Sequence, residues 1–518
     1  MSKQRTTILG GAVLVGSVVA LCGLQALGQS EPWTVADLLD GPLRVPDDVA
    51  LRGELEEALD FRIREDHDLM LDAWEPGELI TNARITQDLL EFRHYGNDAL
   101  FVFGDELFEY AFRPEDGLGN NLNRDNVPFA GPLARPNMRR AHVGAFGGPD
   151  AYSCASCHFM GGPDGAGTAT QNAIFFSTDG DRTLNAESRN PPHVLGLGPV
   201  EALAREMTRD LLALRRQASA DAVEQGEPVA VELETKGVSF GRLMALPGGG
   251  FDLSEVEGVD ADLIIKPFGW KGHQPTIRAM AEESFRIHMG LVSTDAQRRI
   301  RDGELSAAAY GDGPWYDVDD DGLTLEIDDG MLTSMVAYLA QLEVPAMRPP
   351  HTPRLQRAFA QGQRLFDEVG CAGCHTPVLE LRDTVLETGG HDTEPIFIDV
   401  AREGEFPKPE PKDGFETAFL VHLYSDLKRH DMGPELASSV GQGDIPATHF
   451  LTRSLWGLAE TSPYLHDGRA PTLDAAIVAH GGEALESRRS YQALSLEERG
   501  AVQVFLLSLS RTPAVFIP

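Results

Sequence analysis

Two copies of the pentapeptide Cys-x-x-Cys-His constrain this chain more than any other feature. They are Cys154-Ala-Ser-Cys157-His158 and Cys371-Ala-Gly-Cys374-His375. This spacing lets two thiols bond covalently to the vinyl groups of one haem while the following histidine ligates the iron. A structural zinc site would need a further ligand pair nearby, and a redox dithiol does not need the adjacent histidine. The sequence therefore predicts two covalently bound haem c groups and a fold built around them.

The N-terminus predicts export. Lys3 and Arg5 precede a largely apolar run from Ile8 to Leu27. Residues 1–28 are expected to be a secretory signal, or an uncleaved membrane anchor because the run is about long enough to span a bilayer. One of the 5 cysteines, Cys22, lies in this run, so the other four are the haem cysteines. We expect a periplasmic protein that meets the membrane only through this segment.

The overall charge limits the partners. The formal net charge is -36, which argues against nucleic acid and anionic membranes as binding partners. Such a surface suits electrostatic steering of a basic redox protein, although it also serves solubility alone. A small cytochrome c or a cupredoxin is the expected electron donor.

Hydrophobic periodicity predicts a mainly α chain, and the two Cys-x-x-Cys-His motifs predict two cytochrome c-like haem domains. The first domain is expected at 29–345, with an N-terminal helical extension and a small β insertion at about 229–270, where short alternating runs replace the helical pattern. The second is expected at 346–518, after a proline-rich boundary. A helix from Pro353 to Glu368 is expected to deliver the second Cys-x-x-Cys-His motif.

An acidic segment between the two motifs resembles a calcium loop. Carboxylates stand at Asp317, Asp319 and Asp321, a glycine follows at the turn, and Asp328 fills the twelfth place. Calcium loops place oxygen ligands at these positions, but their last ligand is normally a bidentate glutamate. Calcium binding and a solvated acidic turn both remain open.

Several motifs resemble the di-haem oxidoreductase family, whose members are described as peroxidases and thiol oxidoreductases. The motifs are His430-Asp-Met-Gly433, Leu455-Trp-Gly-Leu458, Tyr464-Leu-His-Asp-Gly-Arg469, His480-Gly-Gly and Phe268-Gly-Trp-Lys271. That family is similar in turn to bacterial di-haem cytochrome c peroxidases and the methylamine-utilisation di-haem enzyme. The likeness covers roughly residues 100 to 515. It departs at Arg286-Ile-His288-Met-Gly290, where the family has an acidic residue and no histidine.

The resemblance implies a division of labour between the haems. The first, held by His158, would react with hydrogen peroxide, and the second, held by His375, would receive electrons from the donor. A haem with two strong protein ligands passes electrons but cannot bind peroxide. The expected function is therefore peroxide reduction; a pure electron-transfer cytochrome and an oxidase of a protein or thiol substrate are the alternatives.

Three residues are candidates near the first haem. Glu201 is the expected acid–base group for cleaving the O–O bond, although a glutamate at a helix start is also ordinary. Trp270 is the expected relay between the haems, although a tryptophan in such a turn often only packs. His193 is an alternative sixth ligand for the first iron, or a structural residue of its Pro-Pro-His turn.

Candidates near the second haem follow from the same resemblance. His480 occupies the place where the peroxidases have a ligand methionine and the methylamine-utilisation enzyme a tyrosine, so it is the expected sixth ligand. A helix-end histidine bonded to the last carbonyls is the alternative, and Met432 is the rival ligand. His466 and Arg469 are expected to bind haem propionates.

Overall fold

The computed structural model describes residues 84–119, 151–168, 173–176, 186–307, 310–311, 313–319, 321–415, 417–438 and 441–511. All of them belong to one compact unit, Asn82–Pro518. The expected signal or anchor at 1–28 lies outside the described residues, and within them no helix is long and apolar enough to cross a membrane. The expected domain boundary at residue 345 falls inside the unit and stays a prediction.

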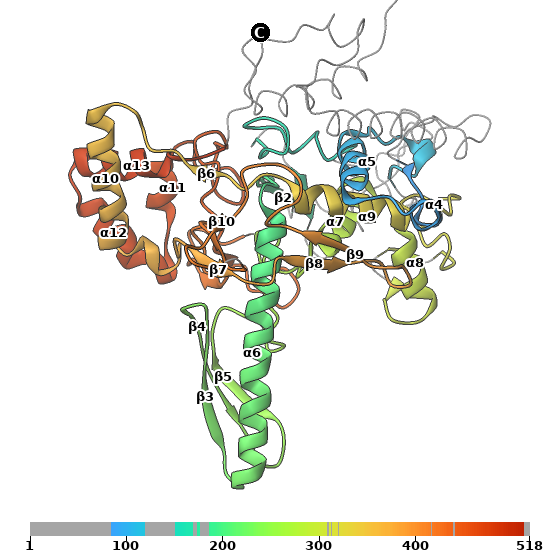
Figure 1. Cartoon of the computed structure of the whole chain (residues 1–518), viewed down its shortest axis with the longest axis horizontal. Helices are drawn as coiled ribbons and strands as arrows, with labels where there is room; N and C mark the ends of the chain where they lie inside the picture. The colour runs from blue at the N-terminus through green and yellow to red at the C-terminus, as the bar shows by residue number, and fades with distance from the viewer. Residues whose placement is uncertain are drawn as a thin grey trace, which may run out of the picture. The chain divides into compact units, whose positions relative to one another are not determined.

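The fold is mainly helical with several small sheets (Figure 1). Before the second motif the helices are α4 (Gln87–Arg93), α5 (Asn97–Glu109), α6 (Leu197–Gln225), α7 (Ile277–Ser284), the π-helix η5 (Phe285–Met289), α8 (Thr294–Arg301), α9 (Asp329–Gln341) and α10 (Pro353–Glu368). After it come α11 (Leu473–Ala479), α12 (Leu485–Ala493) and α13 (Leu496–Leu506). Short 3-10 turns are η2 (Pro114–Asp116), η7 (Cys371–Gly373) and η8 (Gly482–Ala484).

Every described sheet has two or three strands, paired antiparallel. The strands up to the second motif are β1 (Ala173–Phe176), β2 (Ala186–Arg189), β3 (Val229–Thr235), β4 (Val238–Ala245), β5 (Phe251–Val256) and β6 (Ala346–Met347). The later strands are β7 (Leu379–Leu381), β8 (Val385–Thr388), β9 (Ile396–Asp399), β10 (Glu410–Pro411), β11 (Phe419–Val421), β12 (Arg429–Asp431), β13 (His449–Leu451) and β14 (Leu509–Ser510). The pairings include β10-β11-β7, β12-β13, β14-β6 and β8-β9.

The expected β insertion is confirmed as the sheet β3-β4-β5, which lies along the C-terminal part of α6 (Figure 1). Leu233, Phe240 and Leu243 alternate with exposed residues and are buried, as expected for a sheet with one packed face. The strands end at Val256, before the expected limit of 270. The insertion and α6 therefore form one layered element.

Two pairs of closely packed helices flank the motifs. Helix α10 packs on α13, and α5 packs on α9. A Cβ added at Gly362 of α10 would lie 2.0 Å from the backbone oxygen of Ala501, and one at Gly104 of α5 would lie 2.2 Å from that of Ser334. Both glycines therefore let two backbones approach more closely than any side chain would permit.

Local sequence explains how α10 delivers the second motif. The Thr352 hydroxyl accepts a hydrogen bond from Leu355 N, and Pro353 occupies the first helical position, which favours a helix start. After the helix, Gly370 adopts a φ of 88°, a conformation that glycine adopts without strain. The chain turns there and places Cys371 at the start of η7. The expected helix Pro353–Glu368 is confirmed.

Candidate active site

Each Cys-x-x-Cys-His motif lines its own cavity. Cys154, Cys157 and His158 line a cavity of about 210 Å³, called here the first cavity. The second cavity, of about 500 Å³, is lined by the second motif, Cys371, Cys374 and His375. Both linings include aromatic and aliphatic side chains with a few polar groups, which is typical of cofactor sites.

The two motif histidines are held in the same way. His158 Nδ1 donates to Gly165 O at 3.2 Å, and His375 Nδ1 donates to Tyr424 O at 2.9 Å. Burial lowers the pKa of each imidazole to about 4, so both are neutral at physiological pH. A neutral imidazole whose Nδ1 carries the proton presents Nε2 as the acceptor, and such a hydrogen bond orients a metal ligand.

Burial keeps one thiol of each motif protonated. None of the four motif cysteines forms a disulfide, and burial raises the pKa of Cys154 to about 12 and that of Cys371 to about 11. A dithiol that attacks disulfides, or a zinc ligand, works as the thiolate, which a lowered pKa favours. The electrostatics therefore argue against a redox dithiol and fit thiols that become thioethers.

His480 faces His375 across the second cavity. The two ring centroids lie 6.5 Å apart, with ring planes at 56°. A metal–imidazole bond is about 2 Å long, so two rings on opposite sides of one metal ion have centroids roughly 6 Å apart. His480 Nδ1 donates to Ala476 O at 2.8 Å, which again leaves Nε2 as the acceptor. The rival Met432 also lines this cavity.

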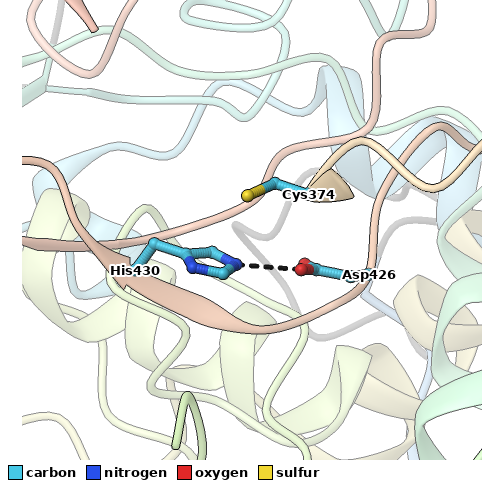
Figure 2. Close-up of side chains that lie close together, drawn as sticks. All are labelled: Cys374, Asp426 and His430. Carbon is cyan, nitrogen blue, oxygen red and sulfur yellow. Dashed lines mark hydrogen bonds and ion pairs between the residues drawn. The ribbon is translucent and has the colours of Figure 1, made fainter. Parts of the chain in front are cut away.

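A charged histidine lies at the edge of the second cavity. His430 Nε2 is 2.9 Å from an Asp426 carboxylate oxygen, and Nδ1 is 2.7 Å from one of Glu483. Carboxylates only accept, so both nitrogens donate and the ring is an imidazolium. Burial lowers the pKa of His430, but the hydrogen bonds to Asp426 and Cys374 outweigh it and raise the pKa to about 11. Figure 2 shows His430 and Asp426 beside Cys374; the fixed charge therefore lies next to a motif sulfur.

A second histidine–carboxylate pair lines the first cavity. His273 Nε2 is 2.5 Å from an oxygen of Glu283, and both residues are part of the lining. Burial raises the pKa of Glu283, but the hydrogen bond from His273 outweighs it, so the pKa is lowered overall. His288, where the chain departs from the family motif, lines the same cavity. The pair can hold and move a proton inside a largely apolar chamber.

Glu201 does not take the place expected for it. Its carboxylate accepts from Ile277 N at 2.7 Å and from Arg205 at 2.5 Å, and it is not among the residues that line the first cavity. Burial raises the pKa of Glu201, and Arg205 partly offsets this rise. Because Ile277 begins α7, the carboxylate serves the N-terminus of that helix, where a negative charge is favourable.

His193 lines the first cavity but has a structural hydrogen bond. Its Nδ1 accepts from Leu195 N at 3.3 Å. Burial lowers its pKa to about 3, with Arg453 contributing in the same direction. This arrangement fits the structural alternative for His193 better than the role of a sixth ligand.

Trp270 lines both cavities. Its Nε1 donates to Asn190 O at 2.8 Å, and its ring meets that of His466 edge-on with centroids 6.4 Å apart. The position is the one a relay would need, and the relay itself stays a prediction.

The two expected propionate partners differ in position. His466 lines the second cavity and stacks on Phe450 at 4.5 Å. Arg469 is not among the lining residues of either cavity. Its guanidinium instead bonds to Asp467 and to Glu435 O.

Three of the four expected calcium ligands come together. Carboxylate oxygens of Asp317, Asp319 and Asp321 all lie within 4.8 Å of one another. Asp328 is not in this group; its carboxylate caps α9 by accepting from Gly330 N at 2.8 Å and also accepts from Gln87 N. The twelfth position is therefore used for a helix cap, and calcium binding stays a prediction.

Residues 250–509, half of the chain, match the family described as "Di-haem oxidoreductase, putative peroxidase". The chain belongs to the di-haem oxidoreductase family. The family resemblance drawn from the motifs is confirmed, although the matched residues exclude the first Cys-x-x-Cys-His motif and Glu201. Membership implies haem cofactors.

Two solved structures are similar to parts of the chain. A MauG-like protein associated with microbial copper homeostasis matches 51% of this chain and 77% of its own, with 14% identity and a TM-score of 0.24. Hydrazine synthase of Kuenenia stuttgartiensis, pressurised with 20 bar xenon, matches 35% of this chain and 56% of its own, with 19% identity and a TM-score of 0.22. The chain thus spans little more than half of the hydrazine synthase chain. No curated protein matches the sequence.

The residues of this di-haem oxidoreductase fit the cofactor that the family implies. Each cavity brings together two cysteine side chains and a histidine with Nε2 as acceptor, within a largely apolar lining. Sequence reasoning found those residues but missed His273, Glu283 and Asp426. The one available signal was that Glu283 lies near the departure from the family motif at Arg286–Gly290; nothing local pointed to Asp426.

Proposed function

We propose that this di-haem oxidoreductase reduces hydrogen peroxide at the first cavity with electrons that enter through the second. The observation that carries the proposal is the difference between the two cavities. In the second, His480 faces His375 at the spacing of two ligands of one iron, which suits electron transfer. The first cavity instead contains the His273–Glu283 pair. We further propose covalent attachment of haem c at both motifs, in two cytochrome c-like domains.

The haem of the first cavity would supply the electrons and the iron site at which the O–O bond breaks. The chain's own residues would handle protons. Reduction of one H₂O₂ to two waters takes two electrons and two protons. The hydrogen bond from His273 keeps the Glu283 carboxylate ionised. The carboxylate can therefore accept a proton from one oxygen of hydrogen peroxide. The protonated pair can then return that proton to the departing oxygen.

The net charge and the predicted export segment support the proposed partner and place of action. A net charge of -36 attracts a basic donor over a long range and speeds its encounter at low ionic strength. We propose that the electron donor is a small cytochrome c or a cupredoxin. We also propose that segment 1–28 directs this chain to the periplasm, where the donor is found.

The proposal is tested by spectroscopy and by turnover. Ferric protein should show one high-spin or exchangeable haem and one low-spin haem, and peroxide should oxidise reduced protein with the stoichiometry above. Two low-spin haems that do not respond to peroxide would instead indicate a pure electron-transfer protein. Replacing Cys154 and Cys157 together should remove one haem and all peroxide turnover, while the spectrum of the other haem remains.

The proton-transfer role has a matched control in the next residue. Glu283→Gln should lower peroxide turnover by about 100-fold or more, the usual contribution of acid–base catalysis. Glu282 is a half-buried neighbour whose carboxylate accepts from Ser293 Oγ and does not line the first cavity. Glu282→Gln should therefore leave peroxide turnover, per molecule of haem-loaded protein, within a few-fold of that of the unmodified protein. Equal losses in the two variants would contradict the assignment to Glu283.

A further inference from the structure

Arg453 lies in the wall shared by the two cavities. Arg453 and Trp270 both line the first cavity and the second. The guanidinium carbon of Arg453 lies 5.7 Å from the centre of the Trp270 ring, within the range of a cation–π contact. Trp270 is held by its bond to Asn190 O. The positive charge is therefore placed where the two cavities adjoin.

The accessible part of Arg453 faces these cavities. Its side chain keeps an intermediate exposure, yet burial alone lowers its pKa to about 10. A side chain that is both accessible and removed from bulk water must border internal space. The guanidinium remains charged at physiological pH, so the wall carries a full positive charge.

No carboxylate of the described residues forms an ion pair with Arg453. The other cations of the second cavity are paired within the protein: Arg488 bonds to Glu435 at 3.1 Å, and His430 to Asp426 and Glu483. A charge taken out of water without a partner strongly disfavours folding. Among the described residues, Arg453 is thus left for an anion that arrives with whatever fills the cavities.

We propose that Arg453 binds a propionate carboxylate of a haem at the wall between the two cavities. The inference rests on the haem occupancy in the proposed function. A guanidinium and a carboxylate form a bidentate, charge-assisted pair, and each haem carries two such carboxylates. Either haem can supply the anion, because Arg453 lines both cavities. Arg453 thus acts as a positioning residue that also sets the potential of the haem it contacts.

The proposal predicts a redox signature rather than a change in packing. A cation beside a haem disfavours the ferric form, so removing it lowers the midpoint potential of that haem. The propionate, once it loses its cation, has a raised pKa. The midpoint potential of the variant should then depend on pH in a range where that of the unmodified protein does not.

The experiment compares Arg453→Gln with Arg469→Gln in the haem-loaded full chain. Spectroelectrochemical titration, without peroxide, follows both haems between about pH 5 and pH 8. Arg453→Gln should lower the midpoint potential of a haem that Arg453 contacts by about 59 mV, which is a tenfold change in its one-electron redox equilibrium. Arg469 is the matched control, because its guanidinium already bonds to Asp467 and Glu435 O. Its variant should leave both potentials and their pH dependence unchanged.

Each outcome decides the question. A shift in the midpoint potential of one haem alone identifies that haem as the source of the propionate. Equal shifts in the midpoint potentials of both haems show that the guanidinium is shared between them. Unchanged potentials and an unchanged pH profile in Arg453→Gln would overturn the proposal, whether or not the protein reduces peroxide. If Arg453→Gln fails to retain haem, Arg453→Lys decides. Haem retention with a near-original pH profile supports the charge pairing, and loss of haem in both variants shows a packing role instead.

Discussion

The contact between α10 and α13 gives a prediction whose size follows from the structure. In Gly362→Ala, the new Cβ would lie 2.0 Å from Ala501 O and 2.5 Å from Ala501 C. A relaxed contact is about 3.5 Å, so the two helices would have to separate by roughly 1.5 Å. Both obstructing atoms belong to the backbone and cannot rotate away. Overpacking of this kind destabilises by about 3 kcal/mol, while alanine favours the helix by about 1 kcal/mol. The net loss is about 2 kcal/mol.

Gly500→Ala is the matched control. Gly500 lies in α13 next to Ala501, and an added Cβ there meets no atom within 4 Å. It should therefore stabilise the protein by up to about 1 kcal/mol through helix propensity alone. Urea unfolding, followed by circular dichroism and by the absorbance of the second haem, measures both variants. Equal stability of the two variants would show that the helices do not meet at Gly362, and the account of how α10 is held would be wrong.

Three further predictions concern the sixth ligand, calcium and pH. His480→Ala should convert one low-spin haem to high spin and shift its potential, whereas Met432→Ala should not; the reverse result in electron paramagnetic resonance would assign the ligand to Met432. Calcium at a hundredfold excess over its dissociation constant should stabilise by about 3 kcal/mol if it binds at Asp317, and an unchanged melting temperature with chelator would contradict this. Burial raises the pKa of Asp164 from 3.8 to about 6, so its contribution to stability is present below about pH 4 and is lost as pH rises through 6. Asp164→Asn should remove that decline from a melting-temperature profile; a profile that still falls would locate the titration elsewhere.

Short-range patterns in the chain predict the haem sites and much of the local structure. The two Cys-x-x-Cys-His motifs predict haem attachment from residue spacing alone, which requires no tertiary contact. Helix α10 and the β insertion were predicted because caps, proline and alternation act over a few residues. The family resemblance likewise rests on short contiguous motifs, and the match over residues 250–509 confirms it.

Which charged side chains reach the cavities depends on how distant segments pack together. Glu201 was the expected acid–base group, but its carboxylate bonds to Ile277 N, 76 residues later in the chain. Glu283 lines the first cavity instead, and Arg453 rather than Arg469 lines the wall between the cavities. The sequence could not distinguish these residues, because the orientation of a buried charged side chain depends on its partners. Folding brings those partners together from distant segments of the chain. The physical reason is that desolvation and pairing depend on distance in space, whereas motifs and caps depend on distance along the chain.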